Sequence, residues 1–131
     1  MFCLQFAHAR GAGRLIQIYA YGGWEDFTSI PTKTSVSANV YVLSLPSFVW
    51  TKVYDGADAN HGRKGHRCHR VAGNLMMVVG GAQATDPTNC VGGGLIRLFN
   101  LNTLAWEDKY DPSLHDDYKI PAVVYNATRG R

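Results

Sequence analysis

The sequence predicts an all-β protein built from short antiparallel strands. Its apolar residues fall in short runs, rich in β-branched and aromatic side chains, which alternate with glycine-rich or polar segments. No segment of useful length shows the apolar period of an amphipathic helix. A pair of glycines and a tryptophan recur at matched intervals along the chain, which indicates an internal repeat.

Composition and charge set the outer limits of this prediction. Hydrophobic residues make up 46% of the 131 residues, which argues against a disordered chain and suits a folded domain. The net charge of +3 comes without a run of lysines and arginines, so nucleic-acid binding is not expected. No apolar run is long enough to span a membrane, and the first residues lack the basic flank of a signal peptide. We therefore expect neither a membrane span nor a signal peptide in this chain.

The first repeat is expected to carry its glycine pair at the end of a strand. Gly22 and Gly23 follow the β-forming run directly, where residues without a Cβ let the chain leave a crowded sheet. Tyr41 lies in the next predicted strand, and Trp50 lies in the strand that returns. The expected elements are, in order, a weakly defined strand at 2–9, a strand at 15–21, a long polar loop at 24–38, and strands at 40–45 and 48–54.

The second repeat follows the same plan. Its glycine pair, Gly80 and Gly81, lies 58 positions after the first (22 to 80), and Trp106 lies 56 positions after its counterpart (50 to 106). His66 lies in the opening strand of this unit. The expected elements are strands at 65–71 and 75–79, a long loop at 82–93, and strands at 94–99 and 104–110. A repeat of this length with four short strands is the pattern of a propeller blade.

Linkers rich in glycine, proline and charge mark the boundaries of the two units. We expect a first unit at residues 1–55, a linker at 56–64, a second unit at 65–111, and a second linker at 112–131 that contains the first strand of a truncated third unit at 120–125. Propeller rings close with about four to eight blades, so two units and part of a third form an incomplete ring. The chain is therefore expected to be a fragment of a longer protein.

The repeated residues resemble those of the kelch family of β-propellers. The likeness covers residues 15–110 and is carried by the apolar run before each glycine pair, the strand after each long loop, and the closing tryptophan. The resemblance implies a kelch-type propeller with two four-stranded blades and the start of a third. The chain departs from the family at Arg97 and Phe99, where kelch blades often carry a Tyr-Asp pair. The residues assigned to the structural repeat are Gly22, Gly23, Tyr41, Trp50, His66, Gly80, Gly81 and Trp106.

A narrower likeness concerns the kelch-repeat proteins of the fungal cell surface. The residues that carry it are 43–48, 63–68, 74–76, 80–81, Cys90 and 118–121. This resemblance implies an extracellular or cell-surface location, in a parent protein that has a membrane anchor. It also supplies much of the argument for a disulfide between Cys68 and Cys90, with two buried thiols in a reducing compartment as the alternative. Cys3 is then the leftover cysteine.

Function is expected to reside in loops, because a repeated scaffold supports many unrelated activities. We expect a non-catalytic scaffold, without a cofactor, that binds through residues 24–38 and 82–93. A protein is the first expectation for the partner, and cell-wall carbohydrate is the second. The alternative is a propeller of a copper-radical oxidase resembling galactose oxidase, which needs histidines, tyrosines and a tyrosine–cysteine crosslink on the propeller axis. No motif in this chain gathers those residue types.

A group near the start of the second unit has the residue types of a zinc site. The group consists of His61, His66, Cys68 and His69. On a strand His66 and Cys68 share one face whereas His69 points to the other, and His61 lies in the linker. We therefore expect no metal site, and we expect His66 to pack or to form a hydrogen bond at the start of its unit.

The C-terminal segment holds two weaker signals. Its acidic residues and a nearby histidine lack the apolar surroundings that shift a pKa, so they are interpreted as part of a solvated loop. These residues are Asp111, His115, Asp116 and Asp117. Asn126 begins an Asn-Ala-Thr glycosylation sequon, which makes it a candidate modification site if the chain is secreted.

Overall fold

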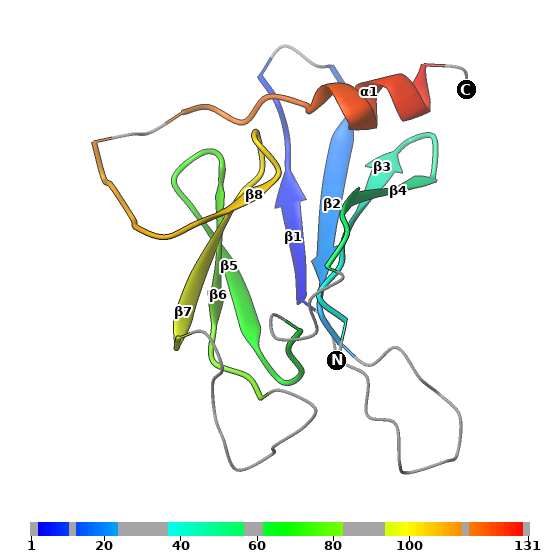
Figure 1. Cartoon of the computed structure of the whole chain (residues 1–131). Helices are drawn as coiled ribbons and strands as arrows, with labels where there is room; N and C mark the ends of the chain where they lie inside the picture. Colours follow the sequence, from blue (N-terminus) through cyan, green and yellow to red (C-terminus); the bar gives the residue numbers. More distant parts are fainter. Residues whose placement is uncertain are drawn as a thin grey trace, which may run out of the picture.

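Two antiparallel sheets of four strands each make up most of the described chain (Figure 1). The structure is a computed structural model that describes residues 3–10, 13–23, 37–56, 62–82, 94–113 and 116–129. Sheet 1 consists of β1 (Cys3–Ala7), β2 (Ile16–Tyr21), β3 (Val40–Leu45) and β4 (Val49–Tyr54). Sheet 2 consists of β5 (Arg67–Val71), β6 (Leu75–Val79), β7 (Ile96–Asn100) and β8 (Ala105–Glu107). The predicted β-sheet architecture is confirmed at this level, and one short helix is added to it.

The strands follow from short runs of β-forming residues that tight turns connect. Along β3, buried and half-buried residues alternate, as they should in a strand with one face in the core. Residues 46–48 and 72–74 form the turns from β3 to β4 and from β5 to β6, and such short connections place the joined strands side by side. The predicted strand at 104–110 is shorter in the structure, where β8 stops at Glu107 and exposed residues follow.

The two sheets carry equivalent residues in equivalent rows. In sheet 1, directly paired residues of the four strands form the row Phe6, Ile18, Leu43 and Trp50. In sheet 2 the matching row is Arg70, Met76, Phe99 and Trp106. Directly paired residues point to the same side of a sheet. Each tryptophan therefore marks one side of its sheet, which we call the tryptophan face, and the other side is the reverse face.

The core lies between the reverse face of sheet 1 and the tryptophan face of sheet 2. Its fully buried residues are Tyr19, Val40 and Val42 from sheet 1, and Met76, Val78 and Phe99 from sheet 2. Trp106 packs edge-on against Tyr21, with ring centroids 5.1 Å apart, and against Tyr54, with centroids 6.3 Å apart. Burying an apolar side chain of this size stabilises a fold by roughly 1.5–3 kcal/mol. The two sheets are thus held by a continuous apolar and aromatic layer.

The first strands of the two sheets, β1 and β5, lie next to each other along the line where the sheets meet (Figure 1). The Nε2 atom of Gln5 donates a hydrogen bond to the Cys68 carbonyl at 2.9 Å. In the opposite direction, Arg70 donates to the Phe6 carbonyl at 3.3 Å. Side chains from each first strand therefore bond to the backbone of the other.

The segment after sheet 2 crosses to sheet 1 and ends in a helix instead of a strand. The predicted strand at 120–125 is wrong, because α1 occupies Ala122–Thr128. Pro121 precedes it, and the fixed φ and missing N–H of proline are compatible with a helix start. Val124 is the fully buried residue of α1, and Ile120, just before Pro121, packs against the core, so the segment is held to the core on both sides of the proline. The described part of the chain contains no helix with the length and apolar character that crossing a membrane requires.

A buried pair of tyrosines holds the C-terminal segment against sheet 1. The hydroxyls of Tyr19 and Tyr118 lie 3.0 Å apart, and Tyr19 donates to the Leu101 carbonyl at 3.1 Å. Burial raises the pKa of both phenols, that of Tyr118 to about 12, so both hydroxyls stay protonated at neutral pH. One side chain of sheet 1 thereby contacts both the β7–β8 turn and the C-terminal segment.

Candidate functional site

The glycine pairs and His66 lie together at one end of the molecule, opposite α1 (Figure 1). Gly22 and Gly81 flank the histidine: a Cβ on Gly22 would collide with the ring, and a Cβ on Gly81 would lie 2.9 Å from His66 Cβ. Both glycines have positive φ, 74° and 91°, a conformation that side chains disfavour. His66 is buried, and its Nε2 lies 3.2 Å from the Tyr21 carbonyl. The glycine pairs thus leave room for a histidine that joins the two sheets.

Arg63 connects the bases of the two predicted binding loops. Its carbonyl accepts a hydrogen bond from Gly23 N at 2.8 Å, at the start of the first loop. Its guanidinium donates to the carbonyls of Gly80 at 3.0 Å and Gly94 at 2.7 Å, on either side of the second loop. The residue is only 1% exposed. The parts of these loops that lie outside the described residues are 24–36 and 83–93.

Burial sets the charges at this end of the molecule. Burial lowers the pKa of Arg63, but an arginine stays protonated at neutral pH, and carbonyl oxygens solvate its charge. Burial also lowers the pKa of His66, and the charge of Arg63 acts in the same direction, so the imidazole is neutral at pH 7. Burial raises the pKa of Tyr21 to about 12. A fixed cation and a neutral imidazole engaged by a carbonyl suit a structural joint better than proton transfer.

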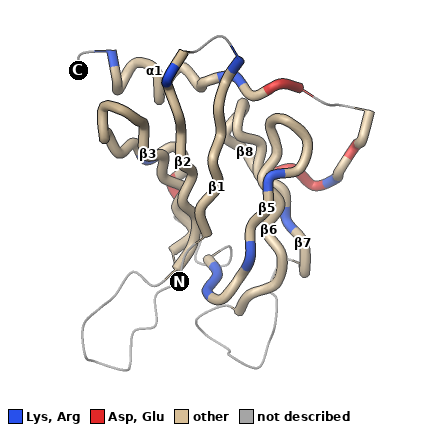
Figure 2. Tube along the Cα trace, turned by 180° about the vertical axis from the view of Figure 1, so that it is seen from behind, with Lys and Arg blue, Asp and Glu red and all other residues tan. Residues whose placement is uncertain are grey.

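Basic residues prevail on β5 and the segment before it, whereas acidic and basic residues are mixed after β8 (Figure 2). Basic residues recur from Arg63 through β5, whereas no acidic residue occurs between positions 62 and 82. Of the six acidic residues in the described part of the chain, four follow β8, on the segment that leads to α1 and that also carries Lys109 and Lys119. The end that holds the bases of both loops is therefore flanked by positive charge.

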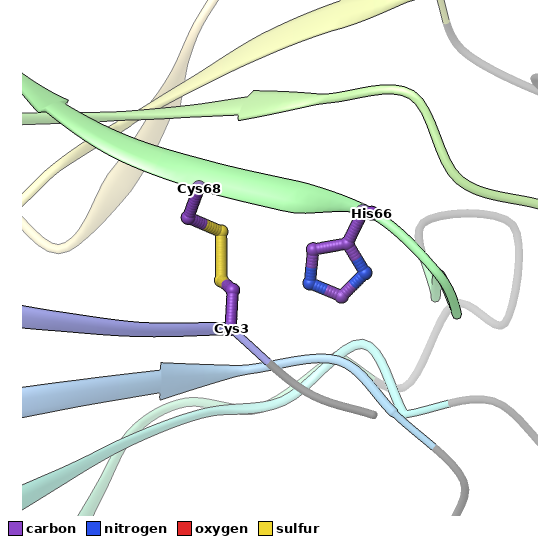
Figure 3. A group of neighbouring side chains, drawn as sticks. All are labelled: Cys3, His66 and Cys68. Carbon is purple, nitrogen blue, oxygen red and sulfur yellow. A yellow bond between two sulfur atoms is a disulfide. The ribbon is translucent and has the colours of Figure 1, made fainter.

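The disulfide of the structure joins Cys68 to Cys3 (Figure 3). The predicted bond between Cys68 and Cys90 is therefore wrong, and Cys3 is not the leftover cysteine. The two Cα atoms lie 5.6 Å apart because β1 and β5 are neighbours, although the residues are 65 positions apart in sequence. Cys90 lies outside the described residues. The bond ties the first strands of the two sheets together.

A group with metal-binding residue types surrounds this bond (Figure 3). One ring nitrogen of His66 and the sulfurs of Cys3 and Cys68 all lie within 4.8 Å of one another. Sulfur binds metals as the thiolate, and both sulfurs are taken up in the disulfide. Of the residues that the sequence grouped with His66, His69 is exposed on β5 and His61 lies outside the described residues. In this oxidised state the group is a covalent joint beside a buried imidazole.

The remaining repeat residues, Tyr41, Trp50 and Trp106, have different surroundings in the two sheets. Trp106 lies between the sheets, and the guanidinium of Arg97 lies 4.5 Å from the centroid of its ring. Trp50 is 58% exposed on the tryptophan face of sheet 1. Tyr41, on the same face, is half-buried, with the Lys52 ammonium 6.0 Å from its ring centroid.

The described candidate residues of the C-terminal segment lie on the surface. Asp116 and Asp117 are exposed, and Asp111 is exposed with its carboxylate accepting from the Ser113 hydroxyl at 2.6 Å. Asn126 is exposed on α1. His115 lies outside the described residues.

Arg63 is the residue of this site whose role sequence reasoning missed. The residue fell in the predicted linker at 56–64 and entered only as part of a resembling motif. Its guanidinium donates to backbone carbonyls, and every residue has one, so the sequence does not reveal which residues are its partners. The one usable signal was its position three residues before His66, in the approach to a strand.

Comparisons with known proteins add no identification. No model of a known protein family matches the chain, and no curated protein sequence matches it. We therefore infer the function from the residues and geometry at the glycine-pair end of the molecule.

Proposed function

We propose that the chain forms two blades of a kelch-type β-propeller and acts as a non-catalytic scaffold that binds another protein. Its two sheets share strand order, register and the positions of the glycine pair and the tryptophan, and these common features support the proposal. The tryptophan face of sheet 2 covers the reverse face of sheet 1, and the first strands are neighbours, as in successive blades. Two blades leave a ring open, so the scaffold would work within a larger protein or assembly.

The link made by Arg63 is the observation that carries the binding role. A loop that recognises a partner gains from a rigid base, since less conformational freedom is lost on binding. Arg63 bonds to the bases of both loops and is buried, so it fixes the places from which both loops leave. Two loops whose bases are held by the backbone and the side chain of one residue would present a single binding surface.

An extracellular or cell-surface location completes the proposal. Disulfides persist in oxidising compartments, and the bond between Cys3 and Cys68 supports such a location. Asn126 is exposed, so its side chain is accessible for the attachment of a glycan. Sensitivity of the secreted chain to a glycan-removing enzyme would show that Asn126 is used.

Replacing the loops tests the proposal. In one variant residues 24–36, and in another residues 83–93, become a short glycine–serine linker. Each variant and the wild type are immobilised and exposed to cell-surface proteins of the source organism, and in parallel to its soluble cell-wall polysaccharide. We expect the wild type to retain one protein specifically, and both variants to lose it while their melting temperatures stay near that of the wild type. Phe48→Ser, in the exposed β3–β4 turn at the other end, is the matched control and should retain the protein.

Three outcomes would contradict the proposal. Retention of the polysaccharide alone would make carbohydrate the partner. Retention of the same protein by both loop variants would move the binding surface elsewhere. Production of peroxide by the copper-loaded chain would favour the oxidase alternative, whose tyrosine–cysteine crosslink would have to use Cys90, because Cys3 and Cys68 are bonded to each other.

A further inference from the structure

Each sheet has one apolar face that the other sheet does not cover. The tryptophan face of sheet 2 packs on the reverse face of sheet 1, which leaves the tryptophan face of sheet 1 and the reverse face of sheet 2. On the first of these, Phe6 is 63% and Trp50 is 58% exposed. On the second, Ile96 is 55% exposed, and Tyr110 beside it is 50% exposed. Large apolar side chains gathered on one face mark an interaction surface.

The two uncovered faces are the counterparts of the two faces that are already in contact. Trp50 occupies the register position of Trp106, and Trp106 packs against Tyr54, which follows Trp50 by four positions. Four positions after Trp106 comes Tyr110. It lines a shallow apolar hollow on sheet 2 together with Val71, Met77, Ile96 and Leu98. When the strands of the two sheets are aligned by their pairing register, the four strand residues of this lining correspond to Ala7, Tyr19, Val40 and Val42. These four residues are buried on the face of sheet 1 that sheet 2 covers.

We propose that the tryptophan face of sheet 1 in one copy of the chain docks on the reverse face of sheet 2 in a second copy, with Trp50 in the hollow beside Tyr110. The contact repeats between copies the stacking that the two sheets already use within one copy. It goes beyond the proposed binding function, because it uses the sheet faces and not the glycine-pair end. The two docking surfaces differ, so the contact is heterologous and each copy can bind one neighbour on either side.

Sedimentation velocity tests the docking in a Cys90→Ser background, which removes the cysteine left over by the disulfide. Trp50→Glu and Ile96→Glu each place a carboxylate in one docking surface and should weaken self-association about a hundredfold. Each variant keeps one intact surface, so an equimolar mixture should form a dimer of one copy of each. Val123→Glu, on an exposed position of α1, is the matched control and should associate like the wild type. Melting curves establish that the variants are folded, and Phe6→Lys replaces Trp50→Glu if the latter is not.

The mixture distinguishes this contact from others. A symmetric dimer would lose association in at least one variant and would not recover it on mixing, and this result would overturn the proposal. A wild type that stays monomeric up to its solubility limit would overturn it as well. Loss of partner binding by the loop variants, with unchanged self-association, would support both proposals separately.

Discussion

Trp50 and Trp106 occupy the same register position in two equivalent sheets, but their surroundings differ. The ring of Trp106 lies between the sheets, 5.1 Å from that of Phe99 and 5.1 Å from that of Tyr21. Trp50 lies opposite Leu43 in its own sheet and is 58% exposed. The difference arises because sheet 1 packs against the tryptophan face of sheet 2, whereas no described element covers Trp50 on the tryptophan face of sheet 1.

The same contrast extends along the whole row. Met76 and Phe99 are fully buried in sheet 2, whereas their counterparts in sheet 1, Ile18 and Leu43, are only half-buried. The repeated sequence therefore specifies a sheet that can be stacked, and the place of a sheet in the stack decides which of its faces is buried. A stacked unit draws part of its stability from its neighbours. Substitutions at the contacts between the two sheets should therefore lower the stability of the chain.

Removing the disulfide should have the largest effect on the stacking. The double variant Cys3→Ala with Cys68→Ala loses a crosslink between residues 65 positions apart, and we expect the free energy of unfolding to fall by about 4 kcal/mol. Urea unfolding followed by tryptophan fluorescence measures the loss. Peptide mapping without reduction should recover the Cys3 and Cys68 peptides as one linked species. A linked pair that contains Cys90 instead would contradict the structure.

The two tryptophans should differ when each is truncated. Trp106→Ala removes a ring from between the sheets and should lower the free energy of unfolding by about 3 kcal/mol. Trp50→Ala removes an exposed ring and should lower it by less than about 1 kcal/mol when measured at high dilution. Urea unfolding of both variants gives the comparison. Equal losses would mean that the face of sheet 1 is covered in solution.

The first glycines of the two pairs provide a second matched comparison. Gly22 and Gly80 have similar positive φ, 74° and 68°, so replacement by alanine strains both by about 1 kcal/mol. A Cβ on Gly22 would also lie 2.7 Å from the Arg63 carbonyl oxygen and collide with His66, whereas one on Gly80 meets nothing within 4 Å. We expect Gly22→Ala to be the more destabilising variant by about 2 kcal/mol in urea unfolding. Equal effects would mean that the joint at His66 is looser than described.

The joint at His66 should make stability depend on pH. Burial lowers its pKa in the folded chain below the ordinary value of 6.5, so the unfolded chain binds the proton more readily. Stability is therefore full above pH 6.5 and falls with decreasing pH, by up to about 1.4 kcal/mol per pH unit, until the folded pKa is reached. Urea unfolding at a series of pH values should show a shallower slope for His66→Gln. A slope for His66→Gln equal to that of the wild type would contradict this account.

The strands, their order and the repeat were within reach of sequence reasoning, because each depends on local runs and tight turns. Local reasoning failed at α1, where Val123 and Val124 favour a strand but the segment after Pro121 forms a helix that buries Val124. Pro121 was the local signal, because its fixed φ and missing N–H are compatible with a helix start. The role of Arg63 could not be predicted from local sequence. Its hydrogen bonds go to backbone carbonyls, which any residue type could supply.

By itself, the sequence determined two similar units, their strands and the tight turns between strands, because each of these depends on a short run of neighbouring residues. Only the tertiary structure decided which cysteines pair, which tryptophan is buried and what holds the bases of the loops. Each of these depends on two sheets meeting at residues far apart in sequence, such as Cys3 with Cys68 and Tyr21 with Trp106. Such contacts follow from the packing of whole faces, and the shape of a whole face is not contained in any local run of residues.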